Sequence, residues 1–181
     1  MMYRVLDLLA ELHVRPVKLV FGGREGFTLW GGNVDGDRDF FLTGRTGKVL
    51  LADSPADLQR RLRNEGGGRL TLLPGFEAVL TSDETLTDAA IDRIDFVRAS
   101  AAIQQGPQSA ANNAGTILTC LNSAADLARQ LRAATVLNGL RDTGAPLRDL
   151  YHFLWDEADA IAPVTEFGEL TAWFTANLEP R

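Results

Sequence analysis

The stretch "VKLVFGGREGFTLWGGNVDGDRDFFLT", residues 17–43, decides the fold of the first half of the chain. It contains three short apolar runs, VKLVF (17–21), FTLW (27–30) and FFLT (40–43), separated by glycine-rich corners. Short apolar runs bounded by glycine and aspartate predict strands. Asp35-Gly36 predicts a tight hairpin turn, because both residues tolerate a positive φ. We therefore expect an antiparallel meander over this stretch.

Further elements flank the meander on both sides. KVLLA (48–52) predicts a fourth strand and RLTLL (69–73) a fifth. Apolar residues at helical spacing predict a helix over residues 3–13. A second helix is expected over residues 54–66, where a serine N-cap and a proline precede the helical pattern and glycines end it.

From about residue 85 onward the apolar pattern is helical. One helix is expected to begin near Thr87, with Ile91 and Ile94 on its buried face. The sequence therefore predicts an α+β fold, in which an N-terminal helix and an antiparallel meander sheet are followed by a helical C-terminal half that packs on the sheet. We expect a strand-rich α/β lobe over 1–80 and a helical lobe over 85–181, with one continuous domain as the alternative.

Both faces of the predicted sheet carry apolar side chains. Trp30 points opposite to Leu29, and Phe41 points opposite to Phe40 and Leu42. A sheet with one face in water would alternate apolar and polar residues, so we expect both faces to be covered. The two early helices are expected to cover one face, and either the helical half or a second copy of the chain covers the other, which makes Trp30 and Phe41 candidate binding residues.

The glycine-rich stretch "LTGRTGKVLLAD", residues 42–53, resembles a phosphate-binding loop only in Gly47-Lys48. A Walker loop has glycine five residues before this pair, a hydroxyl residue after it and a helix beyond. Here Leu42 and Val49 occupy the two positions, and a strand is expected to follow. We interpret the stretch as a hairpin turn.

One helical stretch, "RDLYHFLWDEADA", places Asp149, His152, Asp156 and Asp159 on one polar stripe. Histidine and carboxylates on one face can bind a metal or perform acid–base chemistry. Ligands on one helix rarely converge without a second element, however, so no metal is predicted. The four residues remain candidate binding residues. The alternative is an exposed stripe with a His–Asp pair that contributes about 0.2–0.5 kcal/mol.

Composition narrows the class of protein. The chain has 181 residues, a net charge of −6 and one cysteine, Cys120, at a position with core spacing. Its apolar runs are shorter than the roughly 18 residues of a membrane span, and its negative charge repels phosphate. We therefore predict no membrane and no nucleic acid, no cofactor, and a cytoplasmic location. The arginine-, alanine- and leucine-rich composition is typical of bacterial proteins.

No sequence motif identifies an active site. We therefore predict a non-enzymatic protein-binding or regulatory factor, for example an inhibitor of a basic partner, with a protein partner or a homodimer. The alternative is a small-molecule enzyme whose site lies at the sheet–helix junction, gathering His152, Asp156 and residues 104–115.

Overall fold

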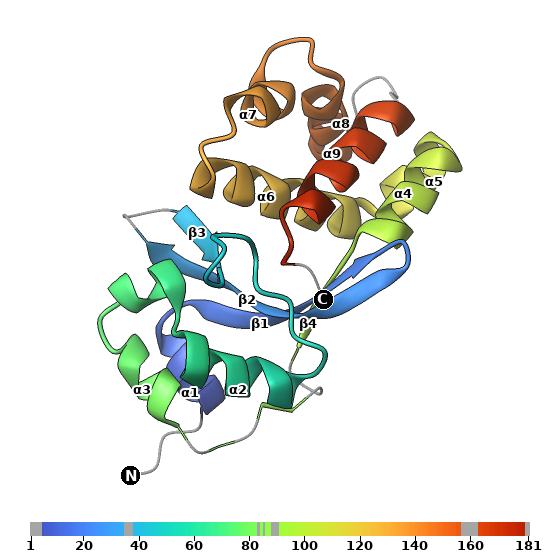
Figure 1. Cartoon of the computed structure of the whole chain (residues 1–181). Helices are drawn as coiled ribbons and strands as arrows, with labels where there is room; N and C mark the ends of the chain where they lie inside the picture. The colour runs from blue at the N-terminus through green and yellow to red at the C-terminus, as the bar shows by residue number, and fades with distance from the viewer. Residues whose placement is uncertain are drawn as a thin grey trace. The chain divides into compact units, whose positions relative to one another are not determined.

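The computed structural model describes residues 5–34, 38–82, 84, 86–87, 91–156 and 163–179. Its four-stranded sheet has the order β3-β2-β1-β4, and the part of the chain that the structure describes between β4 and Ala176 is mainly helical (Figure 1). The predicted α+β class is confirmed. The strands are β1 (Val14–Phe21), β2 (Arg24–Val34), β3 (Arg38–Phe41) and β4 (Asp92–Asp95).

The first three strands form the predicted meander. Gly22 and Gly23 connect β1 to β2. β2 begins at Arg24, so it includes the last three residues of the GGREG stretch that was predicted as a turn. β2 and β3 pair antiparallel with Trp30 opposite Phe41, and the register shifts between Gly31 and Val34. Sequential strands are therefore neighbours, as the glycine corners predict.

The predicted strands at 48–52 and 69–73 are wrong. Residues 48–52 contribute only isolated bridges, of which Phe27 with Ala52 is one. Residues 69–73 fall mostly within the 3-10 helix η1 (Gly68–Leu72), in which only Leu70 is buried. A strand against this core would bury alternate residues, whereas a single tight turn buries one.

The predicted helix start near Thr87 is also wrong. Ile94 lies in β4, and α4 (Phe96–Gln104) begins only after Asp95. The Asp95 side chain accepts a hydrogen bond from the Arg98 N–H at 2.9 Å and so caps the helix. Ile91 and Ile94 are three residues apart, which is also the spacing of neighbours on one face of a helix. The prediction was wrong because this spacing alone does not exclude a strand.

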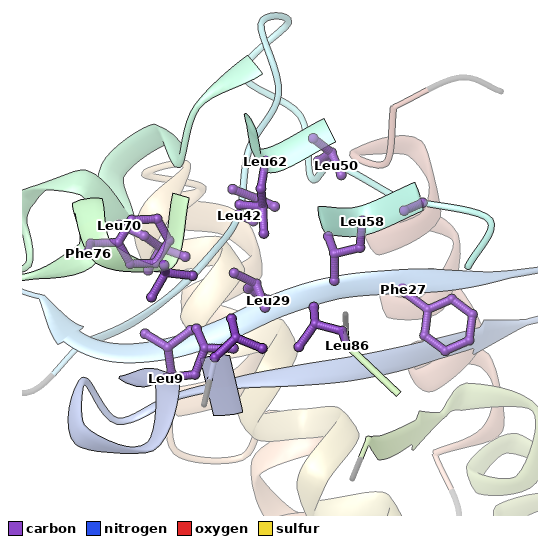
Figure 2. Packing of buried hydrophobic residues seen from close by; sticks show 14 of the residues in the cluster. Leu9, Phe27, Leu29, Leu42, Leu50, Leu58, Leu62, Leu70, Phe76 and Leu86 are labelled. Carbon is purple, nitrogen blue, oxygen red and sulfur yellow. The ribbon is translucent and has the colours of Figure 1, made fainter. Parts of the chain in front are cut away.

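One compact unit contains Met1–Leu19, Arg24–Arg93 and Asn177–Arg181. In this unit α1 (Val5–Glu11), α2 (Pro55–Glu65) and α3 (Phe76–Thr81) lie on the same side of the sheet (Figure 1). The helices and η1 enclose an apolar core against β2 (Figure 2). Its central side chains are Leu9, Phe27, Leu29, Leu42, Leu50, Leu58, Leu62, Leu70, Phe76 and Leu86.

The second compact unit contains Val20–Gly23 and Ile94–Ala176. Besides α4, its helices are α5 (Pro107–Asn112), α6 (Ala114–Gln130), α7 (Ala134–Arg141), α8 (Pro146–Asp156) and α9 (Val164–Ala176). α6 contacts α4, α5, α7, α8 and α9 and is the central helix. The predicted lobes 1–80 and 85–181 remain a prediction.

An aromatic cluster lies within the second unit. The rings of Phe21 and Phe96 stack with centroids 4.8 Å apart, and Phe174 lies 5.5 Å from Phe21 and 5.1 Å from Phe96. Phe167 approaches Phe96 at 6.3 Å. Phe21 comes from the end of β1, so the hairpin contributes one ring to a core that is otherwise helical.

The "LTGRTGK" corner is a turn, as predicted. Thr43 and Val49 form an antiparallel bridge, and Gly44 N–H donates to the Lys48 carbonyl at 3.0 Å. Gly47 has a φ of +75°. The next helix begins only at Pro55, so the glycines of this corner serve turn geometry.

Candidate binding groove

A groove of about 280 Å³ lies between α7, the start of α8 and α9. We call it the α9 groove. Leu147 and Leu170 are buried, whereas Val136, Glu166 and Trp173 are half-buried. The full lining is Thr135, Val136, Gly139, Pro146, Leu147, Glu166, Glu169, Leu170 and Trp173.

The sequence of α9 explains how this surface arises. Phe167, Leu170 and Phe174 are buried and hold the helix in its unit. Each of these three residues is preceded in the sequence by a residue of a second set, Glu166, Glu169 and Trp173. The second set has the same helical spacing and therefore forms a stripe beside the buried one. We did not predict this site. The sequence signal that could have indicated it is Trp173, which lies on the same helical stripe as Glu166 and Glu169.

The groove combines apolar surface with two carboxylates. Leu147, Leu170 and the Trp173 ring give it apolar walls, and Glu166 and Glu169 add negative charge. Its volume is below the roughly 300–1,000 Å³ of common small-molecule sites. An apolar side chain beside a cationic group fits this chemistry.

The predicted Asp149–His152 stripe lies on α8, outside the lining of the α9 groove. His152 is exposed, and its Nε2 accepts a hydrogen bond from Arg148 Nε at 3.3 Å. Asp149 is half-buried, Asp156 ends α8, and Asp159 lies outside the described residues. Within the described ranges, no three His, Cys, Asp or Glu side chains gather as a metal site would need.

Trp30 and Phe41 are 4% and 0% exposed. Their rings stack at 5.8 Å, and the Arg15 guanidinium lies 4.4 Å from the centre of the Trp30 ring. Leu29 and Phe40 instead belong to the core cluster, so the predicted alternation of sheet faces is confirmed. The binding role of Trp30 and Phe41 remains a prediction, because a partner could reach them only after local rearrangement.

Cys120 is fully buried, which confirms the expectation from its spacing. Burial raises the pKa of its thiol far above the usual value, and the negative charge of Asp95 raises it further. The thiolate is the nucleophilic form of cysteine, so this side chain does not provide nucleophilic catalysis at neutral pH.

A second cavity, of about 550 Å³, lies where α1 meets β1. His13 and Asn33 line it, and both have a positive φ, of 54° and 42°. Asp39 also lines this cavity, and its carboxylate accepts a hydrogen bond from the Asn33 N–H at 3.3 Å. The Asp39 carboxylate is therefore engaged by the main-chain N–H of Asn33.

These features define an α+β domain with an apolar groove bordered by acidic residues. The family model of the SatS C-terminal domain matches residues 14–177, and the chain therefore belongs to this family. The crystal structure of the SatS C-terminal domain in complex with bromine is similar to this chain, with a TM-score of 0.76 and 20% identity over 97% of each chain. At this identity the likeness shows the fold alone.

No curated protein matches the chain. None of the described helices has the length and apolar character that crossing a bilayer requires.

Proposed function

We propose that this chain is a non-enzymatic protein-binding domain. In this proposal, the α9 groove accepts an apolar side chain from a partner segment that also carries lysine or arginine. Inhibition or other regulation of a basic partner would be one use of such binding. The observation that carries the proposal is the combination, in one groove, of Trp173 and Leu170 with Glu166 and Glu169.

Charge complementarity supports a basic occupant. The chain carries a net charge of −6, so its overall field attracts positively charged segments. Aromatic side chains in a partly desolvated groove contribute strongly to binding, and rim charges mainly set partner choice and association rate. Trp173 would therefore contribute affinity, and Glu169 would select for positive charge.

The alternative remains an enzyme with a site around His152, Asp156 and residues 104–115. Residues 107–112 form α5 and lie in the same compact unit as His152. The hydrogen bond from Arg148 occupies His152 Nε2, so acid–base chemistry would have to use Nδ1 or break this contact. We favour the protein-binding proposal for this reason.

Two synthetic peptides test the proposal. One has a central phenylalanine flanked by lysines, and the other has glutamates in place of the lysines. We expect the lysine peptide to bind the full chain at least about tenfold more tightly at low salt, as measured by calorimetry. Glu169→Lys should reverse the preference, and Trp173→Ala should weaken binding of both peptides.

Glu77→Lys is the matched control. Glu77 is an exposed glutamate on α3 and does not line the α9 groove, so this variant changes the net charge equally. The proposal predicts that Glu77→Lys keeps the preference for lysine. Equal responses of Glu77→Lys and Glu169→Lys, or no binding of either peptide by the unmodified chain, would contradict it.

A further inference from the structure

The segment Asn177–Glu179, which follows α9, is held as an added strand. Val49 N–H donates to the Asn177 carbonyl at 2.9 Å, and Glu179 N–H donates to the Val49 carbonyl at 2.9 Å. Leu178 forms a parallel bridge with Val49 and is buried. This pattern is the one by which proteins bind extended peptides at a strand edge.

The Glu179 carboxylate is recognised by two side chains. Arg61 Nη2 donates to Oε2 at 2.7 Å, and Thr46 Oγ1 donates to Oε1 at 3.0 Å. Only 7% of the Glu179 side chain is exposed. A charge so deeply buried needs such partners, and hydrogen bonds to charged groups are stronger than neutral ones.

Arg61 is oriented by groups other than Glu179. Its Nε donates to Glu65 Oε1 at 2.9 Å, and its Nη1 donates to the Leu51 carbonyl at 3.0 Å. Burial lowers the pKa of Arg61, but the hydrogen bonds and charges of Glu65 and Glu179 outweigh it and raise the pKa above the usual value. The contacts with Glu65 and the Leu51 carbonyl do not involve the segment, so they would still position the guanidinium if the segment left.

Gly44 supplies the space for the carboxylate. A Cβ atom on Gly44 would lie 2.0 Å from Glu179 Oε1. Gly44 is not among the glycines with a positive φ, so its backbone is not in the left-handed conformation that favours glycine. The absence of a side chain at Gly44 therefore makes room for the Glu179 carboxylate.

We infer that Gly44, Thr46, Val49 and Arg61 form a peptide-binding slot that is separate from the α9 groove. Its ligand is an extended partner segment in which leucine precedes glutamate. The chain's own Asn177–Glu179 occupies the slot and competes with that partner. Exchange requires the segment to leave its two backbone hydrogen bonds with Val49, the Arg24 side chain that donates to the Glu179 carbonyl, and the carboxylate contacts of Arg61 and Thr46.

Peptide binding by the full chain tests the slot. The probe is a fluorescent, amide-capped Ala-Asn-Leu-Glu peptide, and the measurement is fluorescence polarisation. In the Glu179→Ala variant the chain's own segment loses its carboxylate contacts. We expect this variant to bind the probe at least about tenfold more tightly than the unmodified chain, because a larger fraction of slots is open.

A change in the peptide provides the control that leaves the protein intact. Replacing the glutamate of the probe by glutamine should weaken binding to Glu179→Ala at least about tenfold, because Arg61 then faces a neutral group. Thr46→Val should also weaken binding of the glutamate probe, because the hydroxyl that donates to its Oε1 is removed. If folded Glu179→Ala binds neither probe, or binds both equally, the slot is only a structural clip for the chain's own segment and the inference is wrong.

Discussion

Gly31 shows that a single missing side chain can be required by backbone geometry. Its φ is +131°, and a Cβ atom there would lie 2.2 Å from the His13 carbonyl oxygen. The neighbouring Gly32 N–H donates to the same oxygen at 2.9 Å. This close approach, at the irregular end of β2, joins the α1–β1 connection to the strand.

Gly31→Ala should therefore destabilise the chain by more than about 2 kcal/mol, because strain and a backbone clash add. Gly168→Ala is the control, since Gly168 lies on α9 with open space around it. Alanine favours a helix over glycine by up to about 1 kcal/mol, so the control should be slightly more stable. Urea unfolding followed by circular dichroism measures both, and equal midpoints would contradict the prediction.

Cys120 should be unreactive in the folded chain. Its thiol is buried and its pKa is raised, so both access and thiolate are lacking. An aromatic disulfide reagent at pH 8 should release its chromophore only when the chain is unfolded in guanidinium. Rapid stoichiometric release from the folded chain would show that the α6 core opens.

At the scale of elements, α2 shows sequence signals and structure in agreement. Ser54 Oγ accepts a hydrogen bond from the Asp57 N–H at 3.1 Å, and Asp57 Oδ2 accepts one from the Asp53 N–H at 3.1 Å. Pro55 begins the helix and Gly66 follows its end. These residues are local signals and need no knowledge of the tertiary fold.

Ser54→Ala should lower the free energy of unfolding by about 1 kcal/mol, because an N-terminal amide of α2 loses its acceptor. Thermal or urea unfolding measures this effect. Ser100→Ala is a suitable control, because Ser100 lies within α4 and not at a helix end. A similar loss in both variants would argue against a specific capping role.

Asp57 should make stability depend on pH. Burial alone raises its pKa, but the Asp53 N–H, the Arg60 hydrogen bond and the charges of Arg60 and Arg61 outweigh burial, so the pKa is lowered from its ordinary value of 3.8. A lowered folded-state pKa stabilises the fold above about pH 4, and this contribution is lost as the pH falls through the folded-state pKa. Asp57→Asn should therefore be less stable than the unmodified chain at pH 7. The difference should shrink toward pH 2 in urea titrations, and a difference that is constant with pH would contradict the assignment.

Other elements could not be predicted from local pattern. The apolar run at 48–52 has strand composition, yet its partners are dispersed, with Val49 bridging Thr43 and Leu178. The pairing with Leu178 joins residues that are distant in sequence, so no window of the sequence contains it. The α9 groove was missed for a similar reason, because it requires α7 and α8 to meet Glu166, Glu169 and Trp173.

At the scale of the whole molecule, Phe21 shows that the helical unit uses a residue from the hairpin. Phe21→Ala should cost about 3–5 kcal/mol, because the stacked contact with Phe96 is replaced by a cavity. Phe21→Leu retains most of the apolar volume and should cost less. Hydrogen exchange should show faster opening of α4 and α9 in the alanine variant. Loss of protection confined to β1 and β2 would contradict this role.

The chain changes compact unit after Leu19, Gly23, Arg93 and Ala176. A single cleavage after Arg93, where the chain passes from the first unit to the second, would therefore yield two fragments that are each incomplete. The first fragment would lack Leu178 and Glu179, and the second would lack Phe21. Such fragments are suited to complementation, in which each remains poorly ordered alone and regains its fold only when both are mixed.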